Sequence, residues 1–167
     1  TIKKKWFHLY PDENIKYDDS LHWTKVYQNW NMMCGECHTT NYQKNYNADK
    51  KSYDTKWSEI NVGCEACHGP ASTHVNWAKT KSSTISNHNN SYGFDLSYKA
   101  SSANQQIEAC AACHSRRTSL STTFRPHQPL LDNFLPSHLR SELYYPDGQI
   151  KDEVYVYGSF LQSSMYQ

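Results

Sequence analysis

Apolar residues are thinly spread along this chain and seldom form runs. Of the 167 residues, 37% are hydrophobic and 20% are charged, and the mean hydropathy is -0.88. A chain of this length suits a single domain, but the clustered aliphatic side chains of an ordinary large core are missing. The longest apolar runs span only a few residues, far short of a membrane-spanning segment.

Local patterns predict several short helices. Residues 104–117 are rich in alanine and give the strongest helix, residues 64–68 form a short helix ended by Gly69 and Pro70, and another short helix starts at Ser72 and carries His74. Ser20 is a candidate cap for a helix over residues 21–30, which would carry His22.

The remaining segments predict loops and a little β structure. Residues 41–60 are polar and are expected as loop with short extended pieces, and four prolines predict turns over residues 124–149. Alternation from residue 152 predicts a strand that passes into a helix. The fold class expected is therefore mainly α, with extensive irregular loops and minor β. Residues 1–167 are expected as one domain, with residues 79–102, rich in Ser, Asn and Lys, as an exposed polar insertion.

All six cysteines fall into three pairs of identical spacing, and each pair is followed at once by histidine. In a helix these three positions share one face, so two sulfurs and an imidazole point the same way. That arrangement suits the attachment of c-type haem, in which two thioether bonds hold the macrocycle and the imidazole binds the iron. The motifs, read as cofactor-binding, are Cys34, Cys37 and His38; Cys64, Cys67 and His68; and Cys110, Cys113 and His114.

A disulfide framework and a zinc site are the rival interpretations. Neither requires the histidines, and the chance that all three pairs precede histidine is on the order of 10⁻⁴ from composition. Two pairs would fill one Cys₄ zinc site and leave the third pair unused. A thioredoxin-like site would need a βαβ pattern, which the chain lacks. The motifs therefore predict three covalent haems c, which would also form most of the interior, with the 5 Trp and 13 Tyr packed on them.

Each iron needs a second axial ligand unless it stays open for chemistry. Six further histidines remain: His8, His22, His74, His88, His127 and His138. His22 and His74 are favoured because they lie in predicted helices with flanking aromatics, and the others are weaker candidates. The six residues from His68 to His74 span at most roughly 20 Å, so His74 is expected to bind the iron of a neighbouring haem. The predicted metal ligands are His38, His68, His114, His22, His74 and His8.

Beyond the motifs, the chain resembles the multihaem c-type cytochromes whose haem region precedes tetratricopeptide repeats, related to the cytochrome c-554 type. The resemblance is carried by "WFHLYPDE", "LHWTKVYQNWN", "TKWSEINVGCEACHGP", "CAACHSRR" and "YYPDGQIKDEVYVYGSFLQSSMYQ". It implies a small multihaem fold built around covalent haems, with His22 and His74 as distal ligands and His8 as a weaker match. His127 and His138 fall where other residues are expected. It also implies further haem motifs before residue 1 and after residue 167.

The leading functional hypothesis is an exported electron carrier, periplasmic or extracellular, whose three bis-histidine haems exchange electrons with redox partner proteins. Such haem attachment takes place outside the bacterial inner membrane, so an export signal is expected upstream. A net charge of +1 gives no indication of nucleic-acid binding. Two alternatives stay open. One is an oxidoreductase with one open iron that acts on a small nitrogen or sulfur oxyanion, with acid–base help from a free histidine or Arg116. The other is a subunit of a conducting haem filament or other homo-oligomer.

Overall fold

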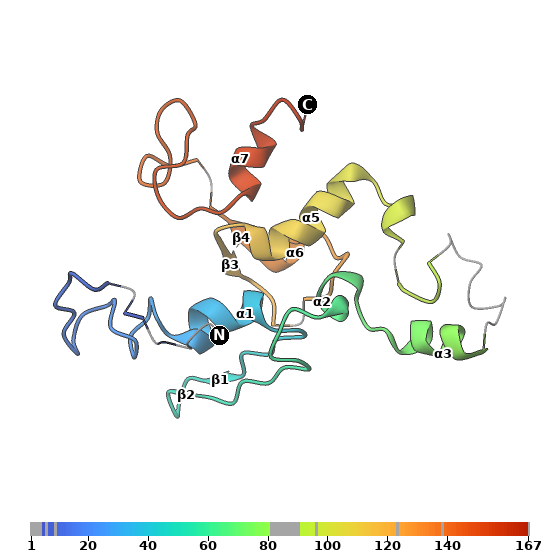
Figure 1. The fold of residues 1–167 in the computed structure, drawn as a ribbon, viewed down its shortest axis with the longest axis horizontal. Helices are drawn as coiled ribbons and strands as arrows, with labels where there is room; N and C mark the ends of the chain where they lie inside the picture. The colour runs from blue at the N-terminus through green and yellow to red at the C-terminus, as the bar shows by residue number, and fades with distance from the viewer. Residues whose placement is uncertain are drawn as a thin grey trace.

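A computed structural model describes residues 5, 7–8, 10–80, 91–95, 97–122, 124–137 and 139–166. Figure 1 shows short helices and hairpins joined by long irregular connections, with α1, α2 and α5 in the middle of the molecule. In chain order the elements are η1 (Trp30–Cys34), α1 (Gly35–His38), β1 (Tyr46–Asn47), β2 (Ser52–Tyr53), α2 (Cys64–His68), α3 (Ser72–Thr80), η2 (Tyr98–Ala100), α5 (Ala103–His114), β3 (Arg117–Ser119), α6 (Leu130–Asn133), β4 (Phe134–Pro136) and α7 (Tyr157–Leu161). The expected mainly α fold with minor β structure agrees with this arrangement.

The predicted helices around the second and third motifs are confirmed. Helix α5 begins with a capping box, in which the Ser102 side chain accepts from the Gln105 N–H and the Gln105 side chain accepts from the Ser102 N–H. Helix α2 ends at Gly69, whose positive φ of 76° favours glycine. Helix α3 starts at Ser72, as expected.

The helix predicted over residues 21–30 is wrong, because turns occupy residues 21–28 and a π-helical segment begins only at Trp30. Trp23, Val26 and Tyr27 remain exposed. Aromatic and β-branched residues are modest helix formers, and short helices depend on packing for their stability. Without a buried face, this stretch does not hold a helix.

The strand predicted from residue 152 is also absent. Tyr155 adopts a positive φ of 61°, which interrupts an extended chain. The helix expected after it is confirmed as α7. Val154 is instead buried with Leu143 and Tyr144 in a small cluster of its own.

The larger hydrophobic cluster surrounds the end of helix α5. Ala111 and Ala112 pack there with Leu130 of α6 and Phe134 of β4. Strand β4 pairs antiparallel with β3, with Arg117 opposite Pro136 and Ser119 opposite Phe134. The cluster therefore fixes β3, and with it Arg117, beside the third cysteine motif.

A second antiparallel pair, β1 and β2, lies between the first two motifs in the chain. Tyr46 is opposite Tyr53, and further bridges at Thr40 and Gln43 extend the ladder toward α1. The short extended pieces predicted within this polar segment are thus confirmed. Within the described part of the chain, no helix has the length and apolar character needed to cross a membrane.

Candidate haem-binding site

Each of the three cysteine motifs lies on a short helix or at a helix end. Cys34 ends η1 and Cys37 and His38 belong to α1, the second motif forms all of α2, and the third ends α5. Helical spacing of three and four residues puts both sulfurs and the imidazole of a motif on one helix face. The imidazole-bearing residues His38, His68 and His114 are exposed. This is the geometry that thioether attachment and proximal ligation require.

All six cysteines are free thiols. In the part of the chain that the structure describes, no three His, Cys, Asp or Glu side chains are grouped so that they could hold a metal ion. The disulfide framework and the tetrahedral zinc site therefore find no support in the fold. The thiols remain available for covalent attachment.

The first and third motifs lie against each other. The Cys37 thiol donates to the Cys113 carbonyl, with 3.8 Å between sulfur and oxygen. A separate side-chain contact with the Cys113 thiol lowers the pKa of Cys37 to about 7; burial opposes this effect, and nearby Arg117 adds to it. The same contact between the two thiols raises the pKa of Cys113.

The second motif lies near the third. Burial raises the pKa of Cys67, and the neighbouring thiols of Cys110 and Cys64 add to this effect. A cavity of about 360 Å³ lies between the three motifs, and its lining includes Glu36, Ala66 and Cys113, one residue from each motif. The three attachment points therefore converge on one region of the molecule.

His74 has the environment of a preoriented metal ligand. Its Nδ1 lies 2.8 Å from the Tyr92 carbonyl oxygen, and its ring stacks on Phe94 and Trp77, with ring centroids 4.2 and 5.5 Å away. A hydrogen bond from Nδ1–H to a carbonyl fixes the tautomer and leaves Nε2 for a metal. The Phe94 ring also contacts the His68 ring, at 5.4 Å between centroids.

The structure gives less support to His22 and His8. The Nδ1 of His22 lies 2.9 Å from Thr24 Oγ1, within a turn rather than the predicted helix. The Nδ1 of His8 accepts from the Tyr10 N–H at 3.1 Å, and the residue is exposed. Both contacts are local and tie neither ring to a motif helix. His88 and His138 lie outside the described residues.

His127, which sequence reasoning discounted, lies beside the second motif. Its ring is 5.1 Å from that of Tyr98, which in turn contacts the His68 ring and donates from its hydroxyl to the Cys67 carbonyl at 2.6 Å. Both His127 ring nitrogens are shielded from solvent and have no hydrogen-bond partner in the structure as described. Burial lowers the pKa of His127, and the nearby His68 backbone acts in the opposite direction. The distance and angle between the ring and that backbone do not meet the criteria for a hydrogen bond. Only the count of spare histidines pointed to this residue.

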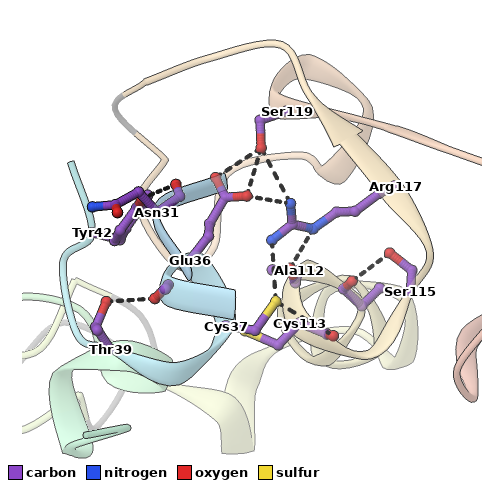
Figure 2. A network of polar contacts seen from close by, with 12 residues as sticks. Asn31, Glu36, Cys37, Thr39, Tyr42, Ala112, Cys113, Ser115, Arg117 and Ser119 are labelled. Carbon is purple, nitrogen blue, oxygen red and sulfur yellow. Dashed lines mark hydrogen bonds and ion pairs between the residues drawn. The ribbon is translucent and has the colours of Figure 1, made fainter. Parts of the chain in front are cut away.

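An ion pair that joins the first and third motifs also escaped sequence reasoning. Arg117 Nη1 lies 2.7 Å from Glu36 Oε2, and the two side chains are only 6% and 23% exposed. Figure 2 shows this pair with Ser119 beside Cys37 and Cys113. Arg116, the residue considered for acid–base chemistry, is more exposed and bonds instead to the Glu153 carbonyl and Asp152.

Comparison of the sequence with protein families gave a match. Residues 3–69 match the family described as cytochrome c554 and c-prime. Over this range, which is less than half of the chain, the sequence is similar to the c-type cytochromes. The match contains the first two motifs whole and ends at Gly69, directly after the second. Comparison with curated proteins and comparison with solved structures gave no match.

The match supports the resemblance to c-type cytochromes seen in the sequence. In proteins of that kind haem c is bound covalently and serves electron transfer. The third motif lies beyond the matched range, on helix α5.

The residues of this chain fit covalently bound haem. Six free thiols lie in pairs with helical spacing, the shielded nitrogens of His127 have no partner, and aromatic rings of Tyr42, Phe124 and Phe134 line the central cavity. Buried polar atoms without partners are rare in proteins, and a ligand at one of these nitrogens would satisfy it. Flat apolar side chains are the natural neighbours of a macrocycle.

Proposed function

We propose that this chain is an exported electron carrier with three covalently bound haems c, each ligated by two histidines. The observation that carries the proposal is the convergence of the three motifs, with Cys37 against Cys113 and Cys67 near Cys110. Haems attached at such points would lie close enough for electrons to pass between them. Haem iron supplies the one-electron chemistry when the group is bound.

The protein's own residues do the holding and orienting. The cysteines of each motif would form the thioether bonds, and His38, His68 and His114 would be the proximal ligands. His74 is held by the Tyr92 carbonyl and by stacking, so its Nε2 is presented in a fixed direction. His22, His8 and His127 are the remaining candidates for the other distal positions. The aromatic side chains around these rings would exclude water.

The whole of residues 1–167 is proposed to act as one haem-bearing domain, in which residues 79–102 are an insertion. The described part of that insertion is not detached, because Phe94 and Tyr98 contact the rings of His68 and His74. Redox partner proteins are expected to dock where haem edges reach the surface. Assembly of further copies into a conducting filament or other homo-oligomer is an alternative to this proposal.

The test is to mature the chain in a bacterial host with cytochrome c assembly machinery and to determine its haem content and spin state. The proposal expects an intact mass equal to the polypeptide plus three haems and wholly low-spin spectra in the oxidised state. A mass with fewer than three haems would contradict the count. A high-spin haem accompanied by turnover of a nitrogen or sulfur oxyanion would establish the enzyme instead.

A further inference from the structure

The buried pair of Arg117 and Glu36 has a role that the motifs alone do not suggest. We propose that this pair fixes the first haem motif against the third and that Arg117 raises the reduction potential of the haem held at the first motif. The inference rests on the proposed haem function and assigns positioning and tuning to two residues outside the haem ligands.

The pair joins segments 81 residues apart in the chain. Glu36 is one of the two residues between Cys34 and Cys37, and Arg117 begins β3, three residues after His114. The Ser119 hydroxyl lies within hydrogen-bond distance of both Glu36 carboxylate oxygens, at 2.7 and 2.6 Å, and also accepts from Arg117 Nη1 at 3.2 Å. Figure 2 shows these three side chains closing a small network over α1.

Further contacts hold the guanidinium to the third motif. Its Nε donates to the Ala112 carbonyl at 2.5 Å, and its central carbon lies 3.7 Å from the centroid of the Phe134 ring. A planar guanidinium bound through several donors and stacked on a ring has little freedom. Arg117 therefore belongs rigidly to the α5–β3 unit, and through Glu36 it holds α1 in place.

The third nitrogen of the guanidinium lies near a sulfur. Arg117 Nη2 lies 3.8 Å from Cys37 Sγ. When Cys37 carries a thioether, it has no S–H to donate to the Cys113 carbonyl, but its sulfur keeps lone pairs that face the guanidinium. The link from Arg117 to the first motif can therefore persist in the haem-loaded protein.

The charge at this position has a predictable electrostatic effect. Reduction of a haem iron lowers the positive charge at its centre, so a nearby cation favours the reduced state and an anion favours the oxidised state. Because Arg117 and Glu36 are largely shielded from water, their charges are weakly screened. Arg117 contacts the sulfur through Nη2, whereas the carboxylate is bound at Nη1, on a different nitrogen.

Removing the charge of Arg117 and removing that of Glu36 should thus shift the reduction potential of the same haem in opposite directions. Arg117→Gln should lower the midpoint potential of one haem, as measured by spectroelectrochemical titration. The equilibrium constant for reduction of that haem should fall at least threefold, which corresponds to about 30 mV at 59 mV per tenfold change. In Glu36→Gln the same midpoint should rise. Arg116→Gln is the matched control, because Arg116 is adjacent in sequence but pairs with exposed Asp152, 3.8 Å away; it should leave all three midpoints unchanged.

A purely structural role would lower stability without this pattern of opposite shifts. Unchanged midpoints in both Arg117→Gln and Glu36→Gln, with three haems still bound, would overturn the inference while leaving the electron-carrier proposal intact. A wild-type chain that binds no haem would instead remove the proposal on which the inference rests. If Arg117→Gln fails to mature, Arg117→Lys decides: lysine cannot bond the carboxylate and the sulfur together, so the same haem should shift downward by a smaller amount, and no shift would count against the role.

Discussion

The ring of His74 is held in one orientation by its neighbours. Its Nδ1 is bound to the Tyr92 carbonyl, and Phe94 and Trp77 stack on its ring. Those contacts fix the direction of Nε2, as is required of a histidine that binds a metal.

Replacement of His74 by Ala should therefore leave one iron without its distal ligand. We expect one of the three haems to change from low-spin to high-spin, while the haem content stays the same. Electron paramagnetic resonance of the oxidised protein measures this change. Asn76→Ala, an exposed position on the same helix α3, is the control. An unchanged low-spin spectrum in His74→Ala would show that His74 is not a ligand.

His127 leads to a second expectation at the same scale. Burying two unpaired ring nitrogens costs free energy, and an iron bond at one of them would offset that cost. His127→Ala is expected to produce high-spin haem, like that expected for His74→Ala, and the double variant should show two high-spin haems rather than one. Magnetic circular dichroism in the near infrared reads the axial ligands directly. Loss of stability with fully bis-histidine spectra would identify His127 as a packing residue.

At the scale of elements, a glycine determines how closely the segment 91–95 approaches helix α3. Gly93 has a φ of 88°, and a Cβ added there would lie 2.9 Å from the His74 backbone nitrogen and the Thr73 carbonyl. Both contacts are with backbone, which cannot move aside as a flexible side chain can. This close approach is what brings the Tyr92 carbonyl within reach of His74.

Gly93→Ala should thus weaken both the fold and the haem site. We expect a loss of about 1–3 kcal/mol in the free energy of unfolding and a partial high-spin signal, because Tyr92 would no longer hold the imidazole. Denaturant unfolding and electron paramagnetic resonance measure the two effects. Gly148→Ala is the matched control: its φ is 83°, but the added Cβ would meet the flexible end of Gln162. Equal spectra for the two variants would contradict this account.

Some elements were predictable from the chain and others were not, for physical reasons. Helix α5 has its capping box and its alanines within one local stretch, and α2 has its stop signal at Gly69, so local sequence was sufficient. The stretch 21–30 had a candidate cap but no face to bury. The contact of Arg117 with Glu36 spans 81 residues, and no local pattern encodes it. Likewise, the three motifs were readable, whereas the burial of His127 was not.

For the whole molecule, the protein-only core is small. Among the residues that the structure describes, few apolar side chains are buried, and large ones such as Trp23, Trp57 and Tyr17 are exposed. Under the proposed function, most of the stabilising burial would come from surface added by bound haem. The haem-loaded protein should accordingly be far more stable than a chain in which the motif cysteines are replaced by serine.

The C-terminal helix adds a pH-dependent contribution to the stability of the whole. Tyr157 of α7 packs against the cluster of Ala111 and Phe134, and burial raises the pKa of its phenol, with Glu108 and Tyr166 adding to the effect. A raised pKa in the folded state means that this contribution is fully present below about pH 10. It is lost as the pH rises through the raised value.

Tyr157→Phe should reduce the alkaline loss of stability by up to about 1.4 kcal/mol per pH unit. The measurement is denaturant unfolding at a series of pH values above 9, with the haems bound. Tyr17→Phe, at a side chain that is 78% exposed, is the control. Parallel pH profiles for the wild type and Tyr157→Phe would show that the phenol stays neutral or ionises equally in both states.

The nearness of Cys37 to Cys113 bears on how such a protein is made. Sulfurs from different motifs are neighbours in the folded chain, and the contact with the Cys113 thiol lowers the pKa of Cys37 to about 7. A polypeptide that packed this way with free thiols would be set to crosslink the wrong partners under oxidising conditions. If the motifs carry haem as proposed, the thiols would have to be kept reduced and alkylated by the porphyrin vinyl groups before the motifs come together.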